Sequence, residues 1–258
     1  MAKTIYLSPS AHGVGANRCL KSGCYEDKHT KPIANETARH LRHNGFNVIV
    51  GTNSDIYARC REANSKNVDL YVPIHTNASG TASARYLMFM FWQDNAAHRK
   101  LFNAVAPKLE AVYPGKLKSK FAVRQELIEI NSVEAMVLYC ELGFHTNKTD
   151  VNEFIHNPKM VGKALAQGIC AYYGVAFKDA DAVEEKKEEK KPEEKKVDGL
   201  YLVRVSSDID IYKAPLEKNG KCPKGAYTII EEKNGFGKLK SSTDKDPRWI
   251  DLSKVKKI

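Results

Sequence analysis

The 258-residue sequence contains no run of about 18 apolar residues, which is the length that a membrane-spanning helix needs. Its opening residues, MAKTIYL, also lack the apolar stretch and the cleavage site of a secretory signal. Its six cysteines form no C-x-x-C pair, which argues against a zinc ribbon and against a disulfide framework. We therefore expect a chain without a membrane anchor, synthesised in the cytoplasm with reduced thiols.

Acidic residues are fewer than basic ones. The sequence has 31 Asp and Glu against 41 Lys and Arg, a formal net charge of +10. Such an excess favours an anionic partner, such as nucleic acid, lipid headgroups or an anionic polymer. The count does not choose among these classes.

Apolar residues almost disappear between Asp179 and Asp198, in the segment DADAVEEKKEEKKPEEKKVD. Such a segment cannot bury enough apolar surface to offset the entropy lost on ordering. Pro192 and the like charges at i,i+4, as in Glu184 and Glu188, also disfavour a helix. We predict three regions: a domain over 1–177, a charged linker over 178–199 and a second domain over 200–258.

The first region alternates strand-like apolar runs with segments of helical period, which is typical of an α/β domain. We expect a twisted mixed sheet flanked by helices. The predicted strands are Thr4–Leu7, Phe46–Val50, Val68–Ile74, Tyr86–Phe91 and Met136–Leu142. The helix signals are Pro32 opening and Gly45 closing a first helix, Ser54 as an N-cap, a Leu101, Val105 and Leu109 stripe, and a last helix from Pro158 to Gly174.

The last region has short alternating runs separated by Gly, Asn, Asp and Pro, and it predicts a small all-β barrel. The runs are Tyr201–Val205, Ala226–Ile230, Phe236–Leu239 and Trp249–Leu252.

Three polar residues stand where predicted strands end. His12 follows the first strand, His75 closes the run VDLYVPIH, and Glu141 lies in the apolar run AMVLYCELGF. A catalytic metal site needs about three such ligands and an open position, and strand ends at one sheet edge supply them well. Each residue taken alone also fits a hydrogen-bonded or ion-paired structural role.

The other histidines weaken this pattern. Five of them lie in segments rich in charged residues, and we interpret them as solvated surface: His29, His40, His43, His98 and His156. The role of His145 stays open. A cysteine hydrolase using Cys140 or Cys24 with a histidine is a further alternative, although Cys140 is most simply an apolar strand residue.

Residues 4–173 resemble the zinc-dependent N-acetylmuramoyl-L-alanine amidases of bacteria and phages, the type 3 amidase family. The resemblance rests on His12-Gly13 after the first strand, on RCREANSKNVDLYVPIHTNA, and on ELGFHTN. It implies an α/β fold with a twisted sheet, a Zn²⁺ cofactor and peptidoglycan as the substrate.

The same resemblance implies site residues. His12, Glu26 and His75 match the family's zinc ligands, and Glu141 matches its catalytic acid/base. Glu26 has two neighbours, Asp27 and His29, that stay open as alternative ligands because the preceding loop can shift the register.

Two further residues are possible substrate contacts. Asn77 stands beside a predicted ligand, and Arg124 precedes the last predicted strand of the first domain. A surface or structural role is the favoured interpretation for Arg124.

The second region resembles a bacterial SH3-like wall-binding module in YTIIEEKNGFGKLKSS and RWIDLSKVKKI. We interpret Tyr227, Phe236 and Trp249 as core aromatics, and we expect wall contacts from Tyr201, Tyr212 or lysines. The expected partners are peptidoglycan and possibly anionic wall polymers, with no nucleic acid and no membrane anchor. The sequence predicts no oligomeric state.

The resemblance implies cleavage of the amide bond between the lactyl group of N-acetylmuramic acid and L-alanine. The absence of a signal sequence favours a phage endolysin, synthesised in the host cytoplasm and acting at the wall after release. A host autolysin or a sporulation amidase would use the same chemistry. A non-catalytic protein that binds wall or nucleic acid through charge is the remaining alternative.

Overall fold

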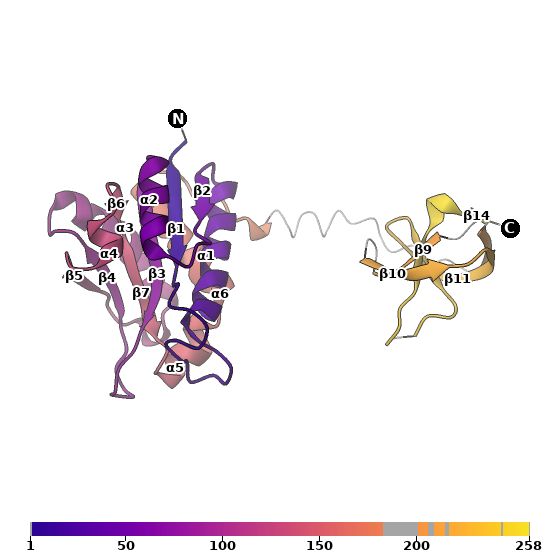
Figure 1. Ribbon diagram of the computed structural model, residues 1–258, viewed down its shortest axis with the longest axis horizontal. Coiled ribbons are helices and arrows are strands. Elements are labelled where there is room, and N and C mark those ends of the chain that lie inside the picture. The colour runs from indigo at the N-terminus through magenta and orange to yellow at the C-terminus, as the bar shows by residue number, and fades with distance from the viewer. Residues whose placement is uncertain (1, 183–200, 206–208, 215–216, 244, 258) are drawn as a thin grey trace. The chain divides into compact units, whose positions relative to one another are not determined.

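The computed structural model describes residues 2–182, 201–205, 209–214, 217–243 and 245–257 (Figure 1). The chain divides after Asp181 into two compact units. Most of the predicted linker, residues 183–199, lies outside the described residues.

The first unit is a mixed sheet flanked by helices. Its strands run in the order β2-β1-β3-β7-β4-β5, with β6 also paired to β3. β4 runs antiparallel to β7, and the other pairs are parallel. The strands are β1 (Thr4–Pro9), β2 (Asn47–Val50), β3 (Leu70–Asn77), β4 (Leu87–Phe91), β5 (Lys120–Val123), β6 (Met136–Val137) and β7 (Tyr139–Phe144).

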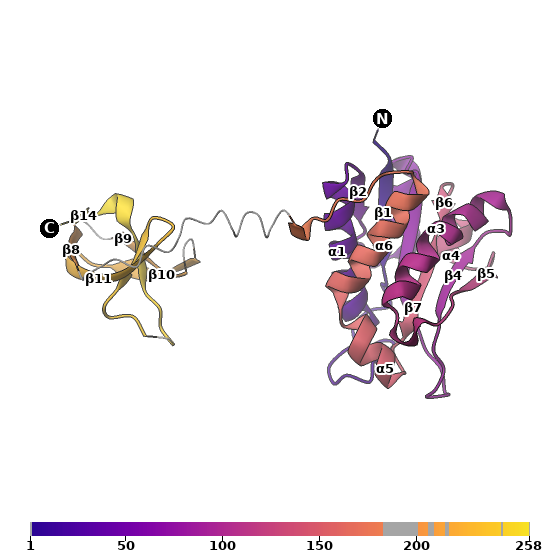
Figure 2. The same ribbon diagram turned by 180° about the vertical axis from the view of Figure 1, so that it is seen from behind.

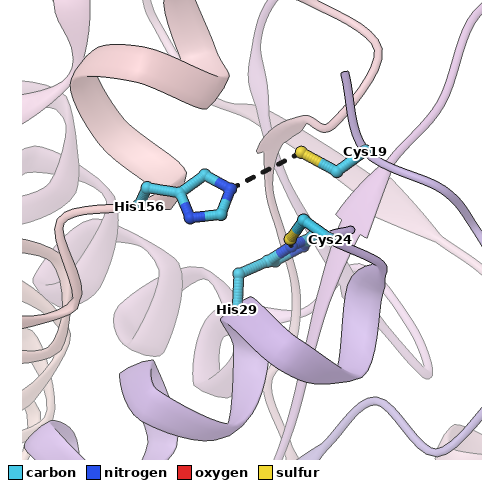
Figure 3. Close-up of side chains that lie close together, drawn as sticks. All are labelled: Cys19, Cys24, His29 and His156. Carbon is cyan, nitrogen blue, oxygen red and sulfur yellow. Dashed lines mark hydrogen bonds between the residues drawn. The ribbon is translucent and has the colours of Figure 1, made fainter. Parts of the chain in front are cut away.

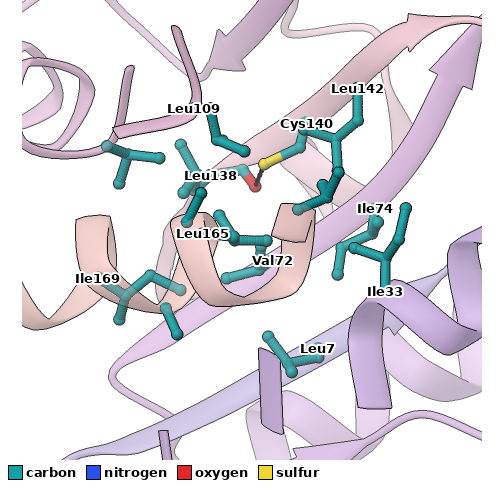
Figure 4. Packing of buried hydrophobic residues seen from close by; sticks show 14 of the residues in the cluster. Leu7, Ile33, Val72, Ile74, Leu109, Leu138, Cys140, Leu142, Leu165 and Ile169 are labelled. Atoms are coloured by element: carbon teal, nitrogen blue, oxygen red, sulfur yellow. Dashed lines mark hydrogen bonds between the residues drawn. The ribbon is translucent and has the colours of Figure 1, made fainter. Parts of the chain in front are cut away.

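Helices cover both faces of this sheet (Figures 1 and 2). α1 (Glu26–His43), α3 (Ala96–Val112) and α6 (Pro158–Tyr172) pack on one face, and α2 (Ile56–Ser65) and α4 (Ile128–Asn131) on the other. Between α3 and β5 is the short 3-10 turn Pro114–Lys116, and before α6 lie α5 (Lys148–Asp150) and the π-helical turn Val151–Ile155. The larger core, part of which Figure 4 shows, joins the middle strands to α1, α3 and α6.

The strand predictions for this unit are confirmed, and the predicted mixed α/β class with them. The predicted run Met136–Leu142 is divided into β6 and β7, and β5 was not predicted. The stripe of Leu101, Val105 and Leu109 is fully buried, as helical periodicity requires. The last helix begins at Pro158 as predicted, with Asn157 as its N-cap.

The predicted start of the first helix is wrong. α1 begins at Glu26, six residues before Pro32, which lies inside the helix. Proline lacks the N–H that would bind the carbonyl oxygen of Lys28, but Lys28 is exposed, so water can satisfy that oxygen. This earlier start places Glu26 in the first turn of the helix.

Two further boundaries differ by a few residues. Asp55, not Ser54, caps α2, and its carboxylate accepts from the backbone N–H of Tyr57 at 2.9 Å. Lys178–Asp181, predicted as the start of the linker, pack on the first unit. There Ala180 is buried, and Asp179 pairs with Lys163.

The second unit is a seven-stranded antiparallel sheet in the order β10-β9-β13-β12-β11-β8-β14. The predicted runs correspond to β8, β11, β12 and β13, and the others were not predicted. The elements are β8 (Tyr201–Val205), β9 (Ile209–Ala214), β10 (Glu217–Cys222), β11 (Gly225–Lys233), β12 (Phe236–Leu239), β13 (Trp249–Asp251), the 3-10 turn Leu252–Lys254 and β14 (Lys256–Lys257).

The aromatic residues of this unit divide differently from the prediction. Phe236 and Trp249 are buried as expected, but Tyr212 is buried with them. Tyr212 and Phe236 meet edge to face, which explains why Tyr212 is not the exposed wall contact that we predicted. Tyr227 is half-buried, and the Tyr201 side chain lies outside the described residues.

Close packing of α6 against α3 depends on Gly168. A Cβ at this position would lie 2.6 Å from Val105 Cα, which is backbone and cannot move aside cheaply. We predict that Gly168→Ala lowers the free energy of unfolding by about 1–3 kcal/mol, measured by urea denaturation.

The matched control is Gly80→Ala, in an exposed loop with no atom within 4 Å of the new methyl group. It should leave stability nearly unchanged. A Gly168→Ala variant that is more stable, as helix propensity alone would make it, would contradict the packing argument.

Candidate functional site

Three neighbouring parallel strands end at the same edge of the first sheet, and the candidate site lies there. β3 pairs with β1 on one side and with β7 on the other. His75 of β3 and Glu141 of β7 are register partners, so their side chains lie beside each other. The loop that follows β1 carries His12 to the same edge.

His12, Glu26 and His75 converge. One ligand atom from each lies within 4.8 Å of the other two. His12 Nε2 is 3.6 Å from Glu26 Oε2, and His75 Nδ1 is 3.0 Å from Glu26 Oε1. Glu26 and His75 are buried, whereas the His12 side chain is 49% exposed, so the group opens to solvent on the His12 side.

Glu26 holds its position through four contacts. Besides the two histidines, its carboxylate accepts from Asn17 Nδ2 and from the backbone N–H of Thr76, the latter at 2.9 Å. Burial alone would raise its pKa, but the bond to His75, the charge of that ring and the other two donors lower it to about 2. Glu26 is therefore a carboxylate at any working pH.

His75 lies between two buried carboxylates. Its Nδ1 faces Glu26, and its Nε2 lies 3.1 Å from Glu129 Oε2. Burial lowers its pKa, and the bonds and charges of Glu129 and Glu26 outweigh this and raise it. The charged ring donates from Nε2 to Glu129 and from Nδ1 to Glu26; a metal bound at Nδ1 would replace only the second proton, and Nε2 would still donate to Glu129.

Glu129, in α4, is a site residue that the sequence analysis missed. Its Oε1 accepts from Ser8 Oγ at 2.6 Å and from Tyr71 Oη at 2.8 Å, while Oε2 holds His75. The available signal was a single charge within the apolar run LIEI, which is the pattern that drew attention to Glu141. Glu129 orients His75 and has no contact with the open side of the group.

Glu141 differs from the other carboxylates at this edge. Its Oε2 is buried and has no hydrogen-bond partner among the described residues. Burial is the main cause that raises its pKa to about 7, and the negative charge of Glu26 adds to it, against the opposing charges of His75 and Arg124. Such a group can both accept and release a proton near neutral pH.

The two alternatives to Glu26 have other contacts. Asp27 accepts from Ser10 Oγ at 2.9 Å and from the backbone N–H of Gly13 at 3.1 Å, so it braces the loop on both sides of His12. His29 points away from this group, and its Nδ1 lies 3.4 Å from Cys24 Sγ. Neither belongs to the set that includes His12 and His75.

Asn77 and Arg124 lie toward opposite ends of the sheet, because β5 runs opposite to β3 and β7. Asn77 ends β3, and its side-chain oxygen accepts from the backbone N–H of Ala78 at 2.8 Å. Arg124 follows β5, is exposed, and pairs with Glu126. It also lies close enough to Glu141 to lower that residue's pKa against the effect of burial.

The surface interpretation of the remaining histidines is largely wrong. His29, His40 and His98 are buried, His156 is half-buried, and among the five only His43 is exposed. Polar partners explain this, because His40 lies near Asp179 and Asp181, and His98 bonds to Asn95. His145, which the sequence left open, is buried against Thr76.

A family model described as N-acetylmuramoyl-L-alanine amidase matches residues 7–171, most of the first unit. The chain belongs to this family. The amidase is therefore a hydrolase of peptidoglycan, as the resemblance implied, and the non-catalytic and cysteine-hydrolase alternatives are set aside.

Solved structures of two amidases and of an endolysin catalytic domain share the fold. The CwlV catalytic domain from Bacillus (Paenibacillus) polymyxa var. colistinus is 18% identical with a TM-score of 0.57, covering 67% of this chain and 99% of that one. CwlD from Clostridioides difficile, solved with the GerS lipoprotein, is 17% identical with a TM-score of 0.58, covering 67% and 98%. The catalytic domain of CD27L, an endolysin targeting Clostridia difficile, is 18% identical with a TM-score of 0.50, covering 66% and 97%.

A comparison with curated proteins returned no match. Within the described part of the amidase, no helix has the length and apolar character needed to cross a membrane.

The donor set of the amidase fits a zinc ion. Two imidazoles and one carboxylate, with one open side, are a ligand set found in catalytic zinc sites. The unpartnered Oε2 of Glu141 beside them is the kind of group that such a site uses for proton transfer. His12, Glu26 and His75 are thus the residues that would hold the metal.

If Glu129 orients His75, removing its charge weakens metal binding. We predict that Glu129→Gln lowers the affinity for zinc by about 10–100-fold, measured by competition with a chromophoric chelator. Glu134→Gln, at an exposed position three residues beyond the end of α4, is the control and should bind as the unmodified amidase does. An unchanged affinity in Glu129→Gln would rule out the orienting role.

The raised pKa of Glu141 makes it a destabilising residue at high pH. Its pKa is about 7 when folded against 4.5 ordinarily, so the folded state holds a proton more tightly, and stability falls as pH rises through about 7. In chelator-treated protein, we predict that Glu141→Gln has a higher melting temperature than the amidase at pH 8 and the same one at pH 4. If the two proteins differ in melting temperature by the same amount at pH 8 and pH 4, the titration of Glu141 is not the cause of the difference.

Proposed function

We propose that this protein is a zinc-dependent amidase that cleaves the bond between the lactyl group of N-acetylmuramic acid and L-alanine of the stem peptide. Membership of the N-acetylmuramoyl-L-alanine amidase family supports the choice of this bond as the one cleaved. The observation that carries the catalytic proposal is the buried, unpartnered Oε2 of Glu141 beside His75. A buried polar atom without a hydrogen-bond partner lowers the stability of the folded state, and its presence indicates a functional role.

In this proposal His12, Glu26 and His75 are the zinc ligands. A zinc ion bound there would polarise the scissile carbonyl and lower the pKa of water. His75 presents Nδ1 because Glu129 holds Nε2, and Glu26 keeps its negative charge because several donors hold it. His12 comes from an exposed loop, so it is the ligand nearest to the side from which a wall polymer approaches.

Glu141 carries the proton. With a pKa of about 7, its carboxylate accepts a proton from the attacking water and then gives it to the departing amine of L-alanine. Near neutral pH such a group is present in both its protonated and its ionised form, which an ordinary exposed glutamate is not. Arg124 and Asn77 are the proposed substrate contacts.

The second unit is proposed as an SH3-like wall-binding module. Its seven-stranded antiparallel sheet and buried Tyr212, Phe236 and Trp249 support a small, well-packed β domain. A catalytic unit joined to a binding unit gains from local concentration on an insoluble polymer. The basic excess of the chain would add attraction to anionic wall polymers.

The setting that we propose is that of a phage endolysin, released to act on the wall of its host. A host autolysin is the alternative, because the family and the fold are common to both settings and the site chemistry is the same.

The test is digestion of purified wall followed by mass analysis of the fragments. We predict new L-alanine amino termini paired with free muramic lactyl groups, abolished by a chelator and restored by zinc. Glu141→Gln should bind zinc normally and lose at least about 100-fold in rate, the typical share of general acid–base catalysis. Glu153→Gln, at an exposed position in the same unit, should be fully active.

Two outcomes would overturn the proposal. New reducing sugar ends would mean a glycosidase. An active Glu141→Gln variant would remove the assignment of the acid/base.

A further inference from the structure

A second group of potential metal ligands lies apart from the one already described. Cys19, Cys24, His29 and His156 each offer one ligand atom, and all four atoms lie within 4.8 Å of one another. Figure 3 shows the four side chains turned toward a common point. Both cysteines are free thiols and are half-buried, and His29 is buried.

The distances between these atoms match a tetrahedral zinc site. Zinc bonds of about 2.3 Å to sulfur and about 2.0–2.1 Å to nitrogen, at tetrahedral angles, place sulfur and nitrogen about 3.5 Å apart. Cys19 Sγ lies 3.5 Å from His156 Nε2, and Cys24 Sγ lies 3.4 Å from His29 Nδ1. Either pair alone fits a thiol–imidazole hydrogen bond, but two such pairs meeting at one point form a four-ligand set.

The spacing of these residues also suits a structural site. Cys19 and Cys24 are separated by four residues, within the C-x₂₋₄-C range of zinc sites, and they are joined by a backbone bond from Cys19 N–H to Cys24 O at 3.2 Å. His29 follows in the first turns of α1. His156 comes from the turn before α6, 127 positions after His29, so no local spacing pattern in the sequence indicates this fourth ligand.

We propose that Cys19, Cys24, His29 and His156 bind a structural zinc ion, distinct from the catalytic one. Two thiolates and two imidazoles select zinc among the common divalent metals when geometry is tetrahedral. All four positions come from protein, so the site is closed and has no place for a substrate. Binding releases the two thiol protons.

His29 shows how the site is oriented. With Nδ1 on the metal, its Nε2 donates to Thr76 Oγ1 at 2.7 Å, the outer hydrogen bond that metal-binding histidines usually make. The backbone N–H of Thr76 in turn holds Glu26 of the catalytic group. One residue of β3 thus contacts both groups.

The proposed ion fixes the loop that carries His12. Residues 10–25 form no helix or strand beyond one isolated bridge, Arg18 with Tyr25, and Val14 and Leu20 are exposed, so little apolar burial holds this loop. Zinc bound at its second half ties it to α1 and to the turn before α6. The loop is then ordered before substrate arrives, which lowers the cost of binding.

Cobalt substitution tests the site in the full chain, because only this group contains thiolates. Protein loaded with Co²⁺ should show a near-ultraviolet thiolate-to-cobalt charge-transfer band, and zinc-loaded protein should hold two zinc ions per chain by elemental analysis. The double variant Cys19→Ser/Cys24→Ser should abolish the band and hold one zinc. His75→Ala should keep the band and also hold one zinc, so failure at either site is seen separately. Cys60→Ala, which removes a buried thiol elsewhere, should keep both the band and two ions.

The unmodified protein alone can overturn the proposal, even where a variant does not fold. Absence of the charge-transfer band, or a disulfide between Cys19 and Cys24 detected by mass, would do so. A band that persists at full intensity in the double variant Cys19→Ser/Cys24→Ser would also exclude these ligands. In zinc-loaded protein we expect trypsin to cut slowly after Lys21, between the two cysteines, and a chelator to make this cleavage faster.

Discussion

The contact between Glu26 and His75 is the interaction on which the candidate site of this amidase depends. Glu26 is the first residue of α1, His75 lies near the end of β3, and both are buried. A buried carboxylate needs charged or hydrogen-bonding partners, and Glu26 takes them from the loop after β1 and from the strand β3 at once. That requirement fixes where α1 begins, how the loop after β1 folds back, and which nitrogen of His75 faces the open side.

The three glutamates at this edge of the sheet differ in their protonation, and the proposed chemistry follows from that difference. Glu26 and Glu129 have their oxygens satisfied and stay ionised, while Glu141 has an oxygen without a partner and holds its proton near neutral pH. Three carboxylates around one imidazole thus take different roles because their surroundings differ. In the proposed mechanism, two of them position and bind, and the third moves a proton.

The sequence predicted the parts of the molecule that depend on local pattern. Apolar runs located the main strands, and the polar residues His12, His75 and Glu141 at their ends are at one edge because parallel strands end together. Local sequence pattern failed where contacts between distant residues determine the structure. Pro32 was mistaken for a helix start. Glu129 was missed because its partners, Ser8 and Tyr71, are 121 and 58 positions away. His29 and His156 were assigned to the surface for the same reason, since only the folded chain brings them to Cys19 and Cys24.

Anomalous diffraction at the zinc absorption edge, on crystals of the full chain, tests the central claim most directly. The account predicts a peak coordinated by His12 Nε2, the Glu26 carboxylate and His75 Nδ1, with Glu141 beside it and not bound to it. A metal held by Asp27 in place of Glu26, or one bound through His75 Nε2 with Glu129 displaced, would contradict it.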